Sequence, residues 1–319
     1  MKKSILITGG AGFIGKNLAK FYLSKNYKVT IIDNFSTSKV DSIKEFKIFK
    51  KFKLIKANIN ENNIRDLIKN NDYIFHLAAS VGVTTILKDP LNSMLNNLNT
   101  TKLVLKYSYK YKKTVLITSS SEVYGLQKNK LLYETDNITF GPSIKARWSY
   151  AISKLTDEFL ALGYYNSKKL NVIVVRLFNT IGSEQTHEYG MVVPRFIRQA
   201  KKNLDITVFG DGKQIRTFTD VNEVVTCLTK LITCKRAYGN VINIGGYEKI
   251  KIIQLAKKII KLTKSKSKIK IIPYKKVYNN NKDYDDMPAR IPSTKKLKSL
   301  INFVPKKNID QILLQIINK

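Results

Sequence analysis

Residues 5–15 read Ile5-Leu6-Ile7-Thr8-Gly9-Gly10-Ala11-Gly12-Phe13-Ile14-Gly15 and decide the fold of this 319-residue chain. The three apolar residues at the start predict a short buried strand, and apolar residues from Phe13 to Leu23 then recur at helical spacing. Between them, Gly10, Gly12 and Gly15 satisfy the pattern G-x-G-x-x-G. Such a junction brings free backbone N–H groups and the positive end of a helix dipole to one point. Because glycine lets a ligand come close to the backbone, the stretch predicts a binding site for a dinucleotide pyrophosphate.

An acidic residue follows at the end of the second predicted strand. Residues 28–32 form this strand, and Asp33 lies eighteen positions after Gly15, close to the roughly 20 expected for a carboxylate that binds the adenosine ribose. A carboxylate there repels a 2′-phosphate, and no arginine occurs in residues 34–37. The expected cofactor is therefore NAD and not NADP.

The chain has an unusual charge. Its 57 lysines and arginines against 23 acids give a formal net charge of +34, a basic excess typical of proteins that bind nucleic acid. Here the lysines are spread along the chain, and the densest stretch, 249–276, also carries apolar residues at helical spacing, which favours a solvated helix face. We therefore expect no nucleic-acid partner, although the positive field would help to attract an anionic nucleotide.

The sequence gives no support to a metal site or a membrane span. Cys227 and Cys234 lie seven residues apart on a predicted helix, outside any C-x-x-C or Cys/His cluster, and we expect two free thiols and no metal. No apolar run reaches membrane-spanning length. The short apolar run after Met1 stops at the glycine turn, which argues against a signal peptide. We expect a cytoplasmic protein.

Strand and helix patterns alternate through the first half of the chain, which predicts a parallel sheet covered on both faces. Further strands are expected at 52–56, 73–77, 114–119 and 172–178, and helices at 64–69, 90–110 and 148–166.

The fold class follows from this alternation. We expect an α/β protein with a Rossmann-type doubly wound parallel sheet in residues 1–178 and a smaller α/β substrate domain in residues 179–319, from which residues 221–245 return to the first domain. Ligands of such sheets lie beyond the carboxyl ends of the strands. This places Asn58, residues 78–80, residues 119–122 and Asn179 around one crevice.

Tyr150 and Lys154 form the pattern Y-x-x-x-K on a predicted helix. Four residues apart, they share one face, and an ammonium beside a phenol favours the phenolate and lowers the tyrosine pKa. Ser120 lies at the end of the strand predicted at 114–119, beside the same crevice. A hydroxyl, a phenol and an ammonium next to a nicotinamide make a site for hydride transfer at a carbinol. The combination favours catalysis over a surface tyrosine–lysine pair and over a serine turn that caps a helix.

Six segments together carry a resemblance that covers nearly the whole chain. The chain resembles the extended short-chain dehydrogenases/reductases, in the group of NAD-dependent nucleotide-sugar epimerases and dehydratases. The matching segments are residues 8–15, 33–37, 76–79, 119–125, 150–154 and 176–179. Their combination is specific for the group, whereas each segment alone is not.

The resemblance implies a role for each matching residue. Lys154 would hold the nicotinamide ribose, and Tyr150, assisted by Ser120, would remove the proton of the sugar 4-hydroxyl. Asn179 would contact the substrate, and Arg216 resembles the arginine that binds the nucleotide diphosphate. The implied cofactor-binding residues are Gly9, Gly12, Phe13, Ile14, Gly15, Asp33, Asn34, Asn58, Ile59, Leu77, Ala78, Ala79, Tyr150 and Lys154.

Two segments depart from the usual pattern of the group. Asn58-Ile59 stands where Asp-Ile or Asp-Val is usual, so that an amide oxygen would contact the adenine. Gly182-Ser183-Glu184 stands where Gly-Pro-Arg is usual and leaves that substrate loop less constrained. Neither change affects the residues expected to transfer hydride.

The branches of the group differ in the fate of the 4-keto sugar that all of them form. Ser121-Glu122, residues 141–150 and Arg290-Ile291-Pro292 resemble the UDP-glucuronate decarboxylases. A β-keto acid loses CO2 readily once its carboxylate is placed and a proton donor meets the enolate, and Glu122 and Arg290 would fill such roles. The resemblance favours decarboxylation of UDP-glucuronate to a UDP-pentose. The catalytic residues would be Ser120, Glu122, Tyr150, Lys154 and Arg290, and the substrate-binding residues Ser121, Asn179, Arg216 and Arg290.

Three alternatives stay open. In a 4-epimerase of UDP-glucose or UDP-glucuronate, Glu122 would orient the sugar and Arg290 would contact phosphate. A 4,6-dehydratase is a weaker alternative because Ser121 replaces the Asp of its usual Asp-Glu pair. A non-enzymatic basic NAD-binding protein is the third, and the complete set of Ser120, Tyr150 and Lys154 argues against it.

The resemblance also implies a homodimer. The group usually dimerises through the helix after Pro90 and the helix that carries Tyr150. The apolar residues available there are Leu95, Leu98, Leu103, Leu155, Phe159 and Leu162.

Overall fold

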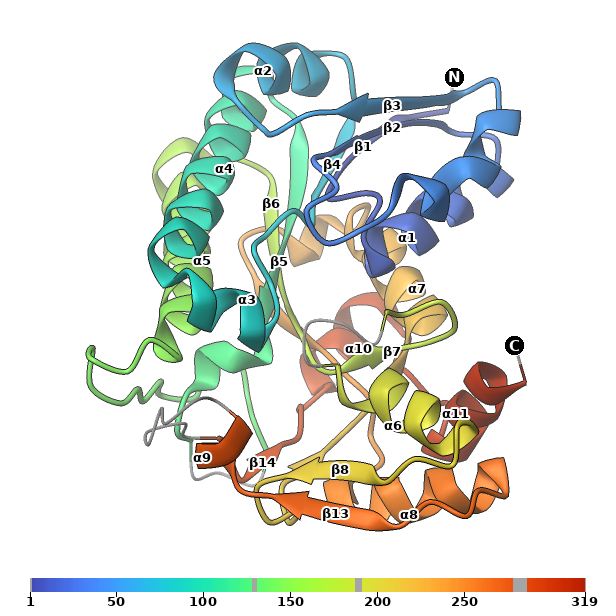
Figure 1. The fold of residues 1–319 in the computed structure, drawn as a ribbon. Helices are drawn as coiled ribbons and strands as arrows, with labels where there is room; N and C mark the ends of the chain where they lie inside the picture. Colours follow the sequence, from blue (N-terminus) through green and yellow to red (C-terminus); the bar gives the residue numbers. More distant parts are fainter. Residues whose placement is uncertain (1, 128–130, 187–190, 278–285, 319) are drawn as a thin grey trace.

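The computed structural model describes residues 2–127, 131–186, 191–277 and 286–318. Its larger lobe, in the upper part of Figure 1, is built on a seven-stranded sheet in the order β11-β6-β5-β4-β1-β2-β3. Neighbouring strands of this sheet are all parallel. The strands are β1 (Ser4–Thr8), β2 (Lys28–Asp33), β3 (Phe52–Lys56), β4 (Tyr73–His76), β5 (Thr114–Ser120), β6 (Val172–Leu177) and β11 (Val241–Ile244).

Helices cover both faces of this sheet, which is why its strands are apolar on both sides. Along β1, Ile5 and Ile7 pack into the core on one face and Leu6 into the core on the other, with the period of two that a strand imposes. The first face carries α1 (Phe13–Ser24), η1 (Val40–Ile48), α7 (Val221–Leu231) and α10 (Lys295–Ile301), and the second carries α2 (Glu61–Lys69), α4 (Pro90–Lys110) and α5 (Trp148–Lys168). The predicted doubly wound parallel sheet is therefore confirmed.

The smaller lobe, in the lower part of Figure 1, has a hydrophobic core of its own. Helix α8 packs Leu255 and Ile259 into this core while Lys257 on the same helix is exposed, so the predicted solvated helix face is confirmed. The elements of this lobe are β7 (Thr180–Ile181), α6 (Val192–Lys201), β8 (Ile206–Phe209), β9 (Ile215–Arg216), β10 (Thr219–Asp220), β12 (Ile250–Lys251), α8 (Ile252–Thr263), β13 (Ile269–Ile272), α9 (Tyr274–Val277), β14 (Ala289–Arg290) and α11 (Ile309–Ile317). The helices α3 (Val83–Lys88), η2 (Ser121–Tyr124) and η3 (Lys235–Ala237) complete the fold.

The ends of the predicted elements shift where side chains cap a helix. Helix α2 begins at Glu61 and not at residue 64, because the Asn60 side chain accepts from the Asn63 backbone N–H and the Asn63 side chain accepts from the Asn60 backbone N–H in return. Helix α4 has its predicted bounds, with Asp89 as the cap and Pro90 in the first turn. Strand β11 pairs with β6 at the edge of the large sheet, whereas the division into domains at residue 178 stays a prediction.

The two cysteines do not share a helix, contrary to the sequence prediction. Helix α7 ends at Leu231, so Cys227 lies inside it and Cys234 lies in the turn before η3. Both are free thiols. Cys227 is buried in the core, and burial raises its pKa to about 12, which makes this thiol unreactive.

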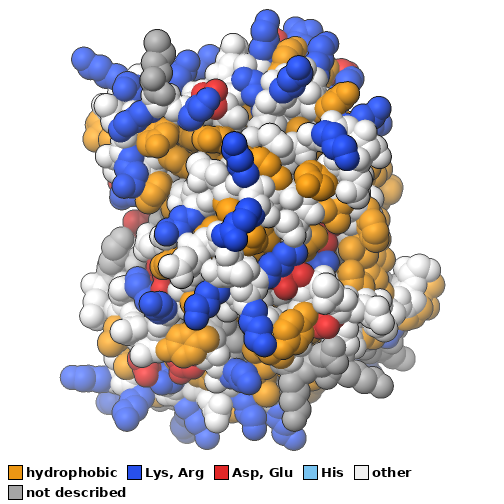
Figure 2. Space-filling model, turned by 180° about the vertical axis from the view of Figure 1, so that it is seen from behind, with side chains coloured by type: hydrophobic (Ala, Val, Ile, Leu, Met, Phe, Trp, Pro, Cys, Tyr) orange, Lys and Arg blue, Asp and Glu red, His pale blue; other side chains and the backbone are white. Residues whose placement is uncertain are grey.

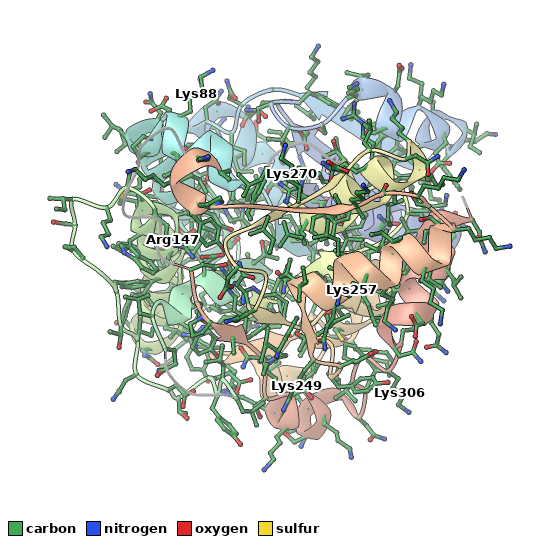
Figure 3. All side chains as sticks on the ribbon, turned by 60° about the horizontal axis from the view of Figure 1, so that its bottom comes forward. Lys88, Arg147, Lys249, Lys257, Lys270 and Lys306 are labelled. Carbon is green, nitrogen blue, oxygen red and sulfur yellow. The ribbon has the colours of Figure 1, made fainter. Side chains whose placement is uncertain are left out.

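Basic side chains are scattered over the surface. Figure 2 shows lysines and arginines spread over one whole face, with polar and apolar side chains between them. The exposed lysines labelled in Figure 3 come from separate elements: Lys88 ends α3, Lys257 lies on α8 and Lys270 on β13. Among the described residues, none of the helices combines the length and the apolar character needed to cross a bilayer.

Candidate active site

One cavity of about 780 Å³ lies beyond the carboxyl ends of the central strands and extends to the smaller lobe. Every residue that the sequence predicted as catalytic, cofactor-binding or substrate-binding lines this cavity. The fold therefore brings together side chains as distant in sequence as those of Asp33 and Arg290. Such a position is the expected one for a ligand of a doubly wound sheet.

The glycine turn forms one end of the cavity. Gly9 has a φ of +67°, and a Cβ at this position would meet the backbone nitrogen of Ala78 at 2.7 Å, so a side chain has no room. Gly12 caps α1 without a side-chain hydrogen bond, and the first turn of α1 holds no acidic residue. The first N–H groups of α1 thus stay available beside the cavity. This helix N-terminus fits the pyrophosphate of NAD.

Asp33 is held in place at the end of β2. Its carboxylate accepts hydrogen bonds from the backbone N–H groups of Ala11 at 2.9 Å and of Phe35 at 2.8 Å. These two bonds fix the carboxylate at the cavity wall, where its remaining lone pairs suit the hydroxyls of a ribose. Next to it, the Asn34 side chain donates to the Asn58 oxygen at 2.8 Å, the oxygen predicted to contact adenine.

Ser120, Tyr150 and Lys154 all line this cavity. Ser120 ends β5 and hydrogen-bonds the Tyr150 phenol. The Lys154 ammonium instead pairs with Asp157 at 2.8 Å. Burial and the charge of Glu122 raise the pKa of Tyr150 above its usual value, against the hydrogen bond from Ser120, which lowers it. The expectation that the neighbouring ammonium lowers the tyrosine pKa is therefore wrong in this structure.

A cluster of charged side chains forms the other end of the cavity. Glu122 is bracketed by two guanidinium groups: Arg147 lies 3.0 Å from one carboxylate oxygen, and Arg290 hydrogen-bonds the other. Asp286 pairs with Arg216 at 2.7 Å and with Arg290 at 2.9 Å. Among the described residues, three arginines and two acids thus face one another with little exposure to solvent. Arg147 is labelled in Figure 3, at the start of α5.

Both acids of this charge cluster are ionised. Burial works to raise the pKa of Glu122, but the charges of Arg290 and Arg147 outweigh it and hold the pKa below its usual value. The pKa of Asp286 is lowered in the same way, by Arg216 and Arg290 against the effect of burial. An ionised Glu122 is not the proton donor that the enolate of a keto acid needs.

Sequence reasoning missed Arg147 and Asp286, which complete the charge cluster. Arg147 lies three residues before Tyr150, one helical turn away, inside the segment 141–150 that carried part of the resemblance. Asp286 lies four residues before Arg290. The sequence could have pointed to them only through their separation of three or four residues from Tyr150 and Arg290. Charged residues at this separation are common in any sequence.

The loop that departs from the usual Gly-Pro-Arg is held by other contacts. Glu184 forms an ion pair with Lys16 of α1 at 2.9 Å, and Ser183 donates to the backbone carbonyl of Gln315 at 3.1 Å. These contacts constrain the loop in place of the missing proline and arginine. In the part of the chain that the structure describes, no group of three His, Cys, Asp or Glu side chains could hold a metal ion.

Comparison with known proteins agrees with this geometry. The chain is 38% identical to the UDP-N-acetyl-alpha-D-glucosaminuronate decarboxylase of Bacillus cytotoxicus, over 99% of this chain and 97% of that protein. It is 30% identical to UDP-glucuronic acid decarboxylase 1 of Danio rerio, over 95% of this chain and 69% of that protein. Among solved structures, the UDP-glucuronic acid 4-epimerase of Bacillus cereus, in complex with UDP-glucuronic acid and NAD, superposes with a TM-score of 0.87 at 25% identity, over 99% and 98% of the two chains. The model of the NAD dependent epimerase/dehydratase family matches residues 5–245. This chain therefore belongs to the NAD dependent epimerase/dehydratase family of enzymes, and its cofactor is NAD.

Proposed function

We propose that the enzyme decarboxylates a UDP-linked hexuronic acid, with UDP-glucuronate as the first candidate, through a 4-keto intermediate. One observation carries the proposal: an ionised Glu122 lies between Arg147 and Arg290, beside Ser120 and Tyr150. Two relatives named as decarboxylases of UDP-linked uronic acids support it. The names differ at C2 of the sugar, so the N-acetylated uronate is the second candidate substrate.

The first step prepares the sugar for the loss of CO2. Tyr150 accepts the proton of the 4-hydroxyl, with Ser120 hydrogen-bonded to both oxygens. Bound NAD would accept a hydride from C4 and would later return it to C4. The positive charge of a nicotinamide beside Tyr150 would oppose the raised pKa of the phenol, because an opposite charge favours the phenolate.

The second step breaks the bond between C5 and C6. A ketone at C4 makes the substrate a β-keto acid, so the electron pair of the broken bond moves into the enolate while the carboxylate leaves as CO2. Arg147 and Arg290 are positioned to orient the carboxylate before this step. The enolate then takes up a proton at C5 from water, because Glu122 is ionised, and the 4-keto group is reduced again as Tyr150 returns its proton to the 4-oxygen.

Glu122 has an electrostatic role in this proposal. Its negative charge offsets two guanidinium charges, so the substrate carboxylate is oriented without forming a strong ion pair. This matters because a carboxylate bound equally well before and during the reaction would lower KM without raising kcat. The carboxylate loses its negative charge as CO2 leaves. If the arginines bind this carboxylate weakly, little binding energy is lost on the way to the transition state.

Mass spectrometry tests the proposed reaction directly. The purified protein is incubated with NAD and, in separate reactions, UDP-glucuronate, UDP-N-acetylglucosaminuronate and UDP-glucose. We expect one of the two uronates to lose the mass of CO2 and UDP-glucose to stay unchanged. Loss of water, an isomer of unchanged mass, or no turnover of any substrate would contradict decarboxylation.

C4-epimerisation is the second candidate, favoured by one specific observation. A structure that superposes well on this chain is a UDP-glucuronic acid 4-epimerase. An epimerase must keep the carboxylate and let the keto sugar present its other face to the cofactor. An isomer of UDP-glucuronate with the same mass, separated by chromatography, would assign this activity.

We further propose that the enzyme is a homodimer. Helices α4 and α5 lie side by side at one edge of the molecule (Figure 1), and they expose Leu95 and Phe159, with 45% and 69% of their surface accessible. Leu98, Leu103, Leu155 and Leu162 are partly buried. We expect Phe159→Glu to produce a monomer in light scattering.

A cytoplasmic location fits the two free thiols.

A further inference from the structure

Asp157 is a buried carboxylate with an unusual set of contacts. It lies one turn after Lys154 on α5, and its Oδ2 accepts from the Lys154 ammonium at 2.8 Å. The two side chains are 0% and 3% exposed. The second oxygen, Oδ1, has no hydrogen-bond partner among the described residues. Half of a buried carboxylate is thus unsatisfied, which costs stability, so local stability does not explain why an acid stands there.

The next residue on the helix, Glu158, shows what a structural carboxylate looks like. Its oxygens accept from the Ser119 hydroxyl and, at 3.0 and 2.8 Å, from two guanidinium nitrogens of Arg176 on β6. Glu158 therefore ties α5 to the sheet through a satisfied network. Asp157 makes no such link, and its one hydrogen bond goes to a residue that lines the cofactor cavity.

We propose that Asp157 is a positioning residue that keeps the Lys154 ammonium charged and directs its two remaining N–H groups toward the bound cofactor. This inference rests on the proposed function, in which Lys154 binds the nicotinamide ribose. An ammonium has three N–H donors, and Asp157 takes one. A buried ammonium without a partner charge favours its neutral form, which would bind a ribose hydroxyl less tightly.

The charged groups near Lys154 decide how a pH dependence of NAD affinity is interpreted. The titratable groups that interact with Tyr150 or Lys154 among the described residues are Asp157 on the same helix, His76 on β4 and Glu122 on η2. The pKa of His76 is lowered to about 3, that of Glu122 is lowered and that of Tyr150 is raised. His76 and Glu122 keep their charge between pH 6 and pH 9. Ionisation of Tyr150 would strengthen the binding of a cationic nicotinamide at pH 9, so it does not account for a loss of affinity there.

The test is the affinity for NAD, measured by calorimetry at pH 6 and at pH 9, with Asp157→Asn. The amide has nearly the same shape but no charge. In the wild type we expect no loss of affinity between pH 6 and pH 9. In D157N we expect near-normal affinity at pH 6 and a loss of about tenfold or more at pH 9, where the uncompensated ammonium gives up its proton.

The matched control is Glu158→Gln, which removes the neighbouring buried carboxylate. We expect E158Q to lower the melting temperature and to leave the pH dependence of NAD affinity unchanged. If D157N fails to fold, as circular dichroism will show, Asp157→Ser removes the same charge with a smaller side chain.

Two results would overturn the inference. One is unchanged NAD affinity of D157N at both pH values, and the other is an equal loss at pH 6 and pH 9, which is the signature of a structural role. A wild type that does not bind NAD at all would contradict the proposed function as well, so the two failures are distinguishable.

Discussion

The two ends of the cavity are built in different ways. The cofactor end is made by a contiguous backbone turn, residues 9–15, with Asp33 fixed beside it by two backbone N–H groups. The substrate end is made by five charged side chains from four separate segments, at positions 122, 147, 216 and the pair 286 and 290. The first end depends on backbone shape, and the second depends on the balance of charges.

This difference separates what is common to the family from what decides the reaction. A turn that holds a pyrophosphate suits any member, because hydride transfer at C4 is shared. In the proposed reaction, the charge balance around Glu122 acts on the carboxylate of the sugar, where decarboxylation and epimerisation diverge. Variants at the two ends should therefore change different quantities.

The largest effect is expected for Tyr150→Phe, which removes the proton acceptor between the two ends. We expect kcat to fall by about 10³-fold, the range for loss of a general base. The affinity for NAD should stay within a few fold of the wild type, because the glycine turn and Asp33 are untouched. Turnover is followed by mass spectrometry of the product and affinity by calorimetry. Substantial remaining turnover would show that another group removes the proton.

A smaller effect is expected for Glu122→Gln at the substrate end. Without the carboxylate, one negative charge is lost beside Arg147 and Arg290, and these arginines bind the substrate carboxylate more tightly. We expect kcat to fall by about 10²-fold while KM falls or stays constant, since tighter binding of the ground state does not speed the reaction. Steady-state kinetics separate the two constants. A higher KM at constant kcat would instead assign Glu122 to substrate binding.

At the cofactor end, Gly15→Ala should act on stability and NAD affinity together. A Cβ at Gly15 would meet the Cα of Gly10 at 2.7 Å, so the backbone of the turn must shift. We expect the free energy of unfolding to fall by about 2 kcal/mol, typical of overpacking, and NAD binding to weaken. Chemical denaturation measures the first effect and calorimetry the second.

Gly163 provides the matched control for this prediction. It lies inside α5, and a Cβ there would have nothing within 4 Å. Gly163→Ala should raise the free energy of unfolding by about 0.5–1 kcal/mol, through helix propensity alone. Equal destabilisation by both alanines would show that the close packing of the turn is not what requires Gly15.

The same contrast explains how far the sequence could be interpreted. Glycine spacing, alternating apolar strands and the carboxylate at position 33 are local patterns with a local physical cause, and they predicted the sheet and the cofactor end. Arg147 and Asp286 gain their meaning from the packing of α5 and β14 around Glu122, which no local pattern records. The contact between Lys154 and Asp157 was missed for a different reason: both residues are close in sequence, but the direction of a lysine side chain depends on what surrounds it.

A smaller effect than that of Gly15→Ala is expected from His76, which contacts Thr8 just before the glycine turn. It is buried and contacts the hydroxyls of Thr8 at 2.7 Å and of Thr101 at 3.1 Å. Burial, together with the charge of Lys154, lowers its pKa to about 3. Because this value lies below the value of about 6.5 in the unfolded chain, His76 stabilises the fold above pH 6.5, and the contribution is lost as the pH falls. From pH 7.5 to pH 5.5 we expect the free energy of unfolding to fall by about 1.4 kcal/mol.

Urea denaturation at the two pH values measures this loss, and His76→Asn should abolish it. Glu122 and Asp286 have lowered pKa values and stay ionised throughout this pH window, so the charge cluster at the substrate end adds nothing to the change. His187 lies outside the described residues, and its substitution serves as the matched variant. His187→Asn should leave the fall in the free energy of unfolding unchanged. Because His76 stays neutral in the folded protein across this window, its protonation should not change the affinity for NAD between pH 7.5 and pH 5.5. If the free energy of unfolding of H76N falls by the same amount between pH 7.5 and pH 5.5, the pH dependence belongs to other groups.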